Sequence, residues 1–323
     1  WLFKPATAWR IRPGSDEGTP LPPETAAGEN PPDGAMIYYY LKNQPRGPLV
    51  LEIYDERGNR VRRYSSADHA PKVNPSKLNI PAFWVHPPQP PSAQPGMHRF
   101  EWNLRYAATG APRNPFDPFS RFSAGPWAPP GAYAVKMSVD GRTQSQSFAL
   151  KLDPRVKTSN LDLQRQFELA TRINQASAQA SATLRSAREL PTKLKQVQSS
   201  PRFKGKLVDA ANALTQKLSQ IMGGASASNP DFSGVEGRSA DQSSLRYVTR
   251  ALGGLEFAVE SADVAPTPDA ERAFKLDQSL LQKNLDVWSQ IEHQDLPQLN
   301  ALLAKAHLQA IELGAAGKGE GKP

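Results

Sequence analysis

Cysteine is absent from all 323 residues of the chain. Without thiols the chain has no disulfide, no metal held by thiolates and no cysteine nucleophile. The absence leaves the cellular compartment open, because cysteine-free proteins occur in the cytoplasm as well as in the periplasm.

The sequence also lacks long apolar runs. Its longest ones fall well short of the ~18 residues that a membrane-spanning helix needs, so no membrane span is expected. The stretch from Trp1 to Arg12 has no positively charged start followed by an apolar segment, which is the pattern of a signal peptide. Because the first residue is Trp1 and not Met, we expect a processed chain or an excised fragment.

The signatures of common active sites are missing as well. There is no nucleophile elbow GxSxG, no phosphate-binding GxxxxGK[ST] or GxGxxG, and no HExxH zinc motif. No two of the five histidines are four residues apart, the spacing at which a helix holds zinc. The sequence therefore assigns no catalytic, cofactor-binding or metal-binding residue, and whether the chain is part of an enzyme stays open.

Basic charge is not concentrated in one part of the chain. The net charge of +8 divides into 18 Lys/Arg against 13 Asp/Glu in residues 1–153, giving +5, and 21 against 18 in residues 154–323, giving +3. The tightest basic run is Arg60, Arg62 and Arg63, where strand alternation puts Arg63 on the face opposite to the other two. A phosphate-binding surface needs a concentrated basic stripe, so the sequence argues against a nucleic acid partner.

Proline and tryptophan divide the sequence into two parts. Residues 1–153 hold 23 of the 31 prolines and five of the six tryptophans, whereas residues 154–323 consist of long stretches rich in Ala, Leu, Gln and Lys. Such a break predicts two folds joined near Asp153-Pro154, with strands first and helices second.

Alternating apolar residues predict a β-rich first part. Strands are expected at 35–41, 49–55, 60–64, 98–105, 133–139 and 148–152. Glu56-Arg57-Gly58-Asn59 and Asp140-Gly141 are the expected hairpin turns. In the strand 98–105, Arg105 is expected to face away from the core. These short strands predict an immunoglobulin-like β-sandwich over residues 35–153, after an irregular linker at 1–34.

The apolar period in the second part lengthens to about 3.5 residues, which predicts helices. They are expected at about 160–191, 203–222, 241–261, 267–288 and 295–306. Ser159 caps the first, Pro191 ends or kinks it, and Asp295 opens the last segment. About four long helices with short connections predict an antiparallel helical bundle over 154–313, followed by a flexible tail at 314–323.

Aromatic residues gather in two proline-rich loops, at 83–84 and 106–131. The candidate contact residues are Phe83, Trp84, Phe116, Phe119, Phe122 and Trp127. Three interpretations are open: they cover the end of the sandwich or its seam with the bundle, they dock another domain of the same protein, or they stack on a carbohydrate.

Six segments, taken together, resemble parts of a known family. They are Trp1-Leu2-Phe3-Lys4-Pro5-Ala6, Pro48–Asp55, Gly58–Arg63, Gly96–Arg105, Pro129–Tyr133 and Asp295–Asn300. The first resembles the exit segment after the last blade of secreted bacterial β-propeller proteins of the BNR-repeat, sortilin-like class. The next four resemble strands of the FlgD-like immunoglobulin fold in those proteins, and the last resembles their C-terminal region.

This resemblance implies a non-catalytic accessory or scaffold region of a larger secreted or periplasmic protein. Such a region docks on the N-terminal β-propeller of the same protein or binds another partner, a protein or a glycan. Propeller proteins of this class are often labelled glycosyl hydrolases, but the SxDxGxxW boxes of the propeller are missing here and no catalytic residue is carried over. The alternative is a part of a glycan-active hydrolase with its site in or near the aromatic loops 83–84 and 106–131. Asp16-Glu17, Asp68 and Asp117 offer carboxylates, and none has a partner at a spacing that implies a shared site.

Overall fold

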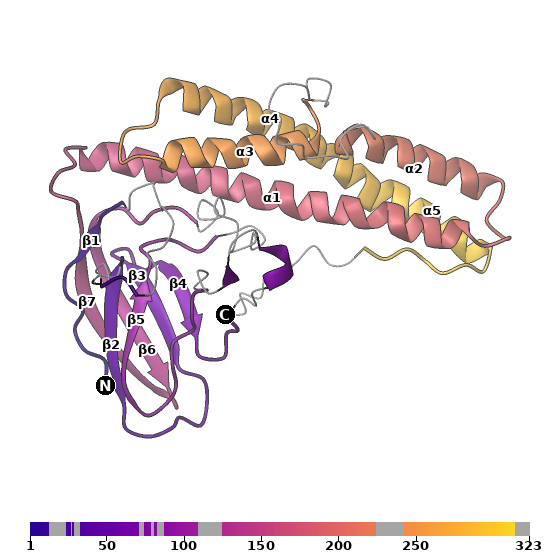
Figure 1. Ribbon diagram of the computed structural model, residues 1–323. Coiled ribbons are helices and arrows are strands. Elements are labelled where there is room, and N and C mark those ends of the chain that lie inside the picture. Colours follow the sequence, from indigo (N-terminus) through magenta and orange to yellow (C-terminus); the bar gives the residue numbers. More distant parts are fainter. Residues whose placement is uncertain are drawn as a thin grey trace. The chain divides into compact units, whose positions relative to one another are not determined.

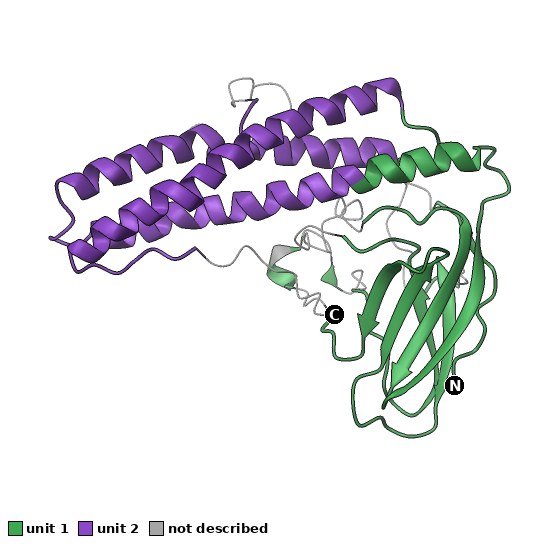
Figure 2. Ribbon diagram, turned by 180° about the vertical axis from the view of Figure 1, so that it is seen from behind, with its two compact units in different colours: residues 1–108, 112–171, 260–266 green, residues 109–111, 172–259, 267–323 purple. Residues whose placement is uncertain are grey.

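The computed structural model describes residues 1–12, 24–26, 28, 33–70, 74–78, 81–82, 87–108, 125–223 and 242–313. The chain forms two compact units, which have different colours in Figure 2. Unit 1 holds the described residues up to Ala108, residues 125–171 and the segment Glu260–Pro266. Unit 2 holds the described residues of 172–259 and those from Thr267 onward.

Strands come first and helices second, as predicted (Figure 1). The strands are β1 (Ala8–Arg10), β2 (Ala35–Leu41), β3 (Val50–Asp55), β4 (Arg60–Ser65), β5 (Gly96–Trp102), β6 (Gly131–Val139) and β7 (Arg142–Leu152), and the short 3₁₀ helix η1 (Pro75–Lys77) lies between β4 and β5. The helices are α1 (Asn160–Gln198), α2 (Lys206–Met222), α3 (Leu245–Glu260), α4 (Pro268–Gln290), the π-helical segment η5 (Ile291–Asp295) and α5 (Leu296–Lys305). None of the described helices is long and apolar enough to cross a membrane.

The strands of unit 1 form two sheets. One has the order β1-β7-β6-β3-β4 and is antiparallel except for the parallel pair of β1 and β7. The other pairs β2 with β5 antiparallel, with Tyr39 opposite His98. The strand β1 lies within the segment expected to be an irregular linker. Its three residues are too few to show alternation, and it forms by pairing with the end of β7, Leu150–Leu152.

Both sheets contribute to one hydrophobic core. Ile37 of β2 and Ile53 of β3 belong to the same buried cluster, and neither is exposed to solvent. The ring of Trp102 on β5 lies 5.3 Å from the ring of Tyr133 on β6 and 6.1 Å from that of Phe148 on β7, measured between centroids. Because each fully buried apolar side chain contributes about 1.5–3 kcal/mol, this core stabilises the unit without any disulfide.

Both predicted hairpins are confirmed. β3 pairs with β4 across the turn that contains Gly58, where φ is +78°. β6 pairs with β7 across Asp140 and Gly141, where φ is +45° and +74°. Positive φ at both central residues is the pattern of a type I′ turn, whose twist matches that of the strands it joins.

The strand predicted at 98–105 ends earlier than expected. β5 stops at Trp102, and Leu104 has a φ of +57°, in the left-handed region. This bend interrupts the alternation, so that Leu104 and Arg105 are both buried. The expectation that Arg105 faces away from the core is therefore wrong. The reason is tertiary: the guanidinium of Arg105 binds the carboxylate of Glu260, which lies 155 positions further along the chain.

Unit 2 has a core of its own. Apolar residues of α1, α2, α4, η5 and α5 meet in one buried cluster, which includes Leu190, Leu194, Leu207, Leu214, Leu218, Trp288, Ile291, Leu299 and Leu303. They recur three or four positions apart along each helix, so each helix turns one apolar side toward the others. Tertiary packing of this kind, and not intrinsic propensity, provides most of the stability of helices in proteins.

Prolines mark two of the predicted helix boundaries, and one boundary is confirmed: α5 begins at Leu296, directly after Asp295, with Pro297 in its first turn. α1 passes through Pro191 and continues to Gln198, so Pro191 does not end it. α4 and α5 are not separated, because η5 joins them and the Leu296 N–H donates to the carbonyl oxygen of Ile291, in the wider π-helical ring that adapts the helix to Pro297. A proline inside a helix costs about 3 kcal/mol, and the buried apolar residues on both sides of each proline offset that cost.

Candidate docking surface and buried ion cluster

The strand β2 lies between two neighbours on its own sheet. On one side, the first residues of the chain run antiparallel to it: the Tyr40 N–H donates to the Trp1 carbonyl oxygen at 2.8 Å, and the Phe3 N–H donates to the Tyr38 carbonyl oxygen at 3.0 Å. On the other side lies β5, with Met97 opposite Tyr40. Three extended segments therefore present their side chains together.

Strand alternation decides which of these side chains face solvent. Leu2, Ile37 and Tyr39 point into the core and are 0% exposed, so their chain neighbours point outward. The outward side chains are Trp1 (64% exposed), Phe3 (39%), Tyr38 (39%), Tyr40 (44%) and Met97 (56%). We call these five residues the aromatic face.

The register of the three segments places members of the aromatic face beside one another. Trp1, Tyr40 and Met97 form one row across the segments, and Phe3 and Tyr38 form the next. Adjacent strands lie ~4.8 Å apart, so side chains in a row are direct neighbours. The aromatic face is thus one continuous apolar surface instead of five scattered exposed residues.

The edge of the aromatic face carries charge of both signs. Arg99 lies opposite Tyr38, and Glu101 lies opposite Met36 on the same solvent side. Burial raises the pKa of Glu101, and the nearby charge of Asp33 adds to this shift. A continuous exposed apolar surface with a polar rim marks a site of interaction, and Trp, Tyr and Arg are the residues that dominate binding energy at protein interfaces.

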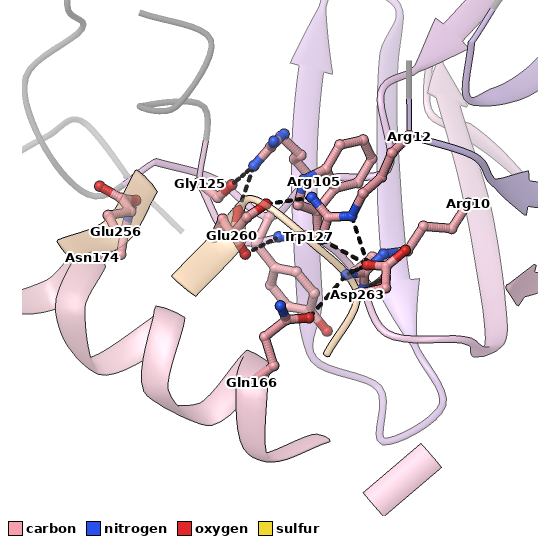
Figure 3. A network of polar contacts seen from close by, with 12 residues as sticks. Arg10, Arg12, Arg105, Gly125, Trp127, Gln166, Asn174, Glu256, Glu260 and Asp263 are labelled. Carbon is pink, nitrogen blue, oxygen red and sulfur yellow. Dashed lines mark hydrogen bonds and ion pairs between the residues drawn. The ribbon is translucent and has the colours of Figure 1, made fainter. Parts of the chain in front are cut away.

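A second site of unit 1 is a buried cluster of ions, seen in Figure 3. One carboxylate oxygen of Asp263, just after α3, accepts a hydrogen bond from Arg10 Nη2 at 2.5 Å and one from Arg12 Nε at 2.8 Å. The side chains of Arg10 and Asp263 are 1% and 2% exposed. Burial lowers the pKa of Arg10, and the charge of Asp263 opposes this shift.

Glu260 holds the other half of the ion cluster. Its Oε2 accepts a hydrogen bond from Arg105 Nη1 at 2.7 Å, and its Oε1 accepts one from the backbone N–H of Trp127 at 3.2 Å. Arg105 Nη1 also donates to the carbonyl oxygen of Gly125 at 2.8 Å. We call Arg10, Arg12, Arg105, Glu260 and Asp263 the ion cluster.

Trp127 lies among the three arginines of the ion cluster (Figure 3). The guanidinium carbon is 4.1 Å from the ring centroid for Arg105, 5.3 Å for Arg12 and 5.6 Å for Arg10. These are cation–π distances. Of the six predicted contact residues, Trp127 is the one within the described part of the chain, and it is half-buried in unit 1.

The start of α1 completes the surroundings of the ion cluster. Gln166 accepts a hydrogen bond from Arg10 and donates one to the carbonyl oxygen of Ala262, and the Thr158 hydroxyl donates to the carbonyl oxygen of Asp263. The acids bind the arginines of the same unit, and the backbone around them is bound as well. These bonds hold the segment Glu260–Pro266 within unit 1, which is a structural role.

The other predicted contact residues, Phe83, Trp84, Phe116, Phe119 and Phe122, lie outside the described residues. The aromatic face was not predicted, although the run Tyr38-Tyr39-Tyr40 contained a signal: in a strand whose core side holds Tyr39, the two flanking tyrosines must face outward. The ion cluster has no signal in the sequence, because its acids lie about 150 to 250 positions from its arginines.

The described residues of unit 1 line a partly open pocket of about 80 Å³, which includes Tyr106, Tyr133 and Phe167. Pockets for small ligands measure about 300–1,000 Å³, so this one is too small. Burial raises the pKa of both tyrosines above the ordinary value, further from neutral pH. In the part of the chain that the structure describes, no group of three or more His, Asp or Glu residues is placed to hold a metal ion.

Comparison of the chain with protein-family models, with curated proteins and with solved structures found no match. The resemblance to secreted β-propeller proteins therefore stays a prediction. Function has to be argued from the aromatic face and the ion cluster themselves.

Proposed function

We propose that this chain is a non-catalytic accessory region of a larger secreted or periplasmic β-propeller protein. Its role is to dock on the propeller of the same protein through the aromatic face. The observation that carries the proposal is the exposure of Trp1, Phe3, Tyr38, Tyr40 and Met97 side by side on one sheet. Leaving so much aromatic surface in water is unfavourable unless a partner covers it.

The position of the aromatic face also supports docking on a preceding domain. Trp1 and Phe3 belong to the face and pair with β2. A propeller joined to Trp1 would thus be connected to the chain directly beside the surface that is proposed to bind it. A short connection of this kind raises the effective concentration of one surface at the other. Even a weak apolar contact is then sufficient to keep the two domains bound.

We extend the proposal to the finer fold: an immunoglobulin-like, FlgD-like sandwich over 35–153 and an antiparallel bundle over 154–313. Support for the sandwich is that the inward residues of both sheets line one core. Support for the bundle is the single apolar cluster that α1, α2, α4 and α5 share, and the packing of α2 against α4 and α5.

Two observations favour docking over catalysis. Both acids of the ion cluster pair with arginines, and Glu260 also accepts the backbone N–H of Trp127, which supports a structural role for them. The pocket beside Tyr106, at about 80 Å³, is smaller than the pockets that bind a sugar. No described feature favours the glycan-active hydrolase, whose expected loops lie mostly outside the described residues.

The test uses this chain and the separately produced propeller of the same gene product. Replacing Tyr38→Ser and Tyr40→Ser together should weaken binding by at least about tenfold, because truncated interface aromatics typically cost over 1 kcal/mol each. Tyr247→Ser on α3 is the matched control, since Tyr247 is 37% exposed and lies outside the aromatic face. Binding is measured by isothermal titration calorimetry.

Two results would overturn the proposal. One is a gene product without a propeller, and the other is binding that the double substitution leaves unchanged. A glycan-binding and hydrolysis screen of this chain serves as a further arm: turnover lost on Asp68→Asn would establish the hydrolase instead.

A further inference from the structure

The strand β5 forms the outer edge of its sheet. The sheet has the order β2-β5, and the first residues of the chain extend it on the side of β2. On the other side of β5, the described residues provide no further strand. We call this side of β5 the free edge. The edge of a sheet offers backbone N–H and C=O groups that can pair with a strand of another molecule.

The hydrogen bonds of β2 show which backbone groups of β5 face the free edge. In an antiparallel sheet, the N–H and C=O groups of successive residues point to opposite sides of the strand. The N–H of Tyr40 and the carbonyl oxygen of Tyr38 bind the first residues of the chain, so the groups of Tyr39 point toward β5. Tyr39 is opposite His98, whose groups therefore point back toward β2. The residues whose backbone groups face the free edge are Met97, Arg99 and Glu101.

The charges along the free edge have both signs. The backbone groups that face it have no hydrogen bond to another described residue. The side chains of Arg99 and Glu101 are exposed on the solvent side of the sheet. Charged side chains usually protect an exposed edge, most often as lysines, because two edges of like charge repel each other. A cation and an anion two residues apart do not give this protection against a copy of the same strand.

A second copy of β5, placed antiparallel, brings opposite charges together in one register. When the two Phe100 residues lie opposite each other, Arg99 of each copy faces Glu101 of the other. A shift by two residues instead places Arg99 opposite Arg99, or Glu101 opposite Glu101. Shifts by one residue are excluded, because backbone groups that face the free edge must lie opposite each other to bond. Backbone pairing and charge therefore favour the same register.

We propose that β5 is the contact strand of a symmetric dimer, in which two copies of this chain pair antiparallel along the free edge. Arg99 and Glu101 make cross-strand ion pairs with the other copy, and their backbone groups exchange hydrogen bonds with it. The contact has the closed two-fold symmetry of most protein dimers, and it places the two aromatic faces on one continuous sheet. It uses the edge of the sheet and does not depend on docking to a propeller.

Sedimentation velocity of the whole chain tests the proposal. The concentrations extend to about 10⁻³ M, because a contact of one strand with another is small and its affinity is weak. A reversible dimer is expected. Arg99→Glu should weaken it by about tenfold or more, since both cross-strand pairs then consist of like charges. Arg142→Glu changes the net charge equally at an exposed position outside β5, and it should leave the dimer unchanged.

Two rescue experiments separate loss of the ion pairs from loss of folding. Arg99→Glu and Glu101→Arg in the same chain exchange the two charges and should restore the dimer. An equimolar mixture of Arg99→Glu chains and Glu101→Arg chains should form a mixed dimer, because each strand then faces one of opposite charge. Circular dichroism checks that each variant is folded.

Hydrogen exchange, followed by NMR, locates the contact. The N–H groups of Arg99 and Glu101 should exchange more slowly as the concentration of the natural chain rises. The proposal fails if the chain stays monomeric throughout the series, if neither rescue restores association, or if exchange at these two residues is independent of concentration. It also fails if Arg99→Glu leaves a dimer intact that Tyr38→Ser with Tyr40→Ser abolishes, because the contact then lies on the aromatic face.

Discussion

The carboxylate of Glu260 is 4% exposed and rests between the guanidinium of Arg105 and the backbone N–H of Trp127. A charge taken out of water loses its hydration, and only the attraction of its partners and their hydrogen bonds compensates for that loss. Removing one partner therefore costs far more in a buried pair than at the surface. At the residue scale, single substitutions in the ion cluster are therefore expected to have large electrostatic effects.

Arg105→Gln should lower the free energy of unfolding by ~3 kcal/mol, because Glu260 stays buried without its cation. The matched control is Arg272→Gln, which breaks the pair with Asp269, 85% exposed, and should change stability by less than about 0.5 kcal/mol. Urea unfolding followed by tryptophan fluorescence measures both, since Trp102 and Trp127 report on unit 1, and Trp288 reports on unit 2, which contains Arg272. Equal effects of the two substitutions would contradict the account of the ion cluster.

Asp153 makes the stability of the folded chain depend on pH. Hydrogen bonds from Arg155 lower the pKa of Asp153 to about 2. The pKa of this carboxyl in the folded chain is thus below that in the unfolded chain, ~3.9. The resulting stability is complete above about pH 5, declines as the pH falls and is lost below about pH 2.

The difference in unfolding free energy between the natural chain and Asp153→Asn should therefore shrink as the pH is lowered from 6 to about 2. Urea titrations at a series of pH values measure it. The same substitution at Asp286, an exposed residue of α4, is the control. A difference that does not change with pH would contradict the role of Arg155.

At the scale of elements, the hairpin of β6 and β7 depends on two residues with positive φ. Gly141 has a φ of +74°, and a Cβ placed on it would meet no atom within 4 Å. Asp140 at +45° also accepts hydrogen bonds from the backbone N–H groups of Arg46 and Gly47. Replacing the glycine therefore tests the backbone conformation alone.

Gly141→Ala should destabilise the chain by ~1–2 kcal/mol, the cost of a Cβ in the left-handed region. Gly254→Ala is the matched counterpart in helix α3, where the added Cβ likewise meets nothing within 4 Å. It should stabilise the chain by ~0.5–1 kcal/mol, because alanine loses less conformational entropy in a helix. Thermal unfolding by calorimetry measures both, and a shift of the same sign in the two variants would contradict this reasoning.

Most elements were predictable because local rules govern them. Alternation and the turn Asp140-Gly141 predicted the hairpin of β6 and β7, and the three-to-four-residue period predicted the helices. Pro191 and Arg105 show where local rules fail. The buried faces on either side of Pro191 hold α1 together, and the carboxylate of Glu260 draws Arg105 inward. The residues of α2, η5 and α5 that cover those faces, and Glu260, lie far along the chain from Pro191 and Arg105, so no window of neighbouring residues contains the information.

At the scale of the whole molecule, the net charge of +8 is spread over both parts of the sequence, and we expect no binding surface for phosphate. In the tightest basic run, Arg60 pairs with Glu52 at 3.1 Å, and Arg62 donates to the carbonyl oxygen of Tyr106 and lies over the ring of Tyr64. Two of its three arginines are thus engaged within unit 1. A basic residue that already has such partners gains little from a phosphate group.

Duplex DNA should accordingly bind with a Kd weaker than about 10⁻⁴ M at physiological salt, the weak end of non-specific binding. Fluorescence anisotropy with a labelled duplex measures this, with a lysozyme-sized basic protein of known DNA affinity as the positive control. Micromolar binding that weakens steeply as salt is added would contradict the prediction.

The amino-acid sequence by itself determined the order of strands and helices, the two hairpins and the alternation that puts Tyr38 and Tyr40 on the side opposite to Tyr39, because periodicity and turn chemistry act over a few residues. Only the tertiary structure decided that Trp1 and Phe3 lie beside those tyrosines, and that Glu260 and Asp263 lie among Arg10, Arg12 and Arg105. The physical reason is that sheet pairing and buried ion pairs are made between groups far apart in the chain, and their free energy depends on burial that no local pattern records.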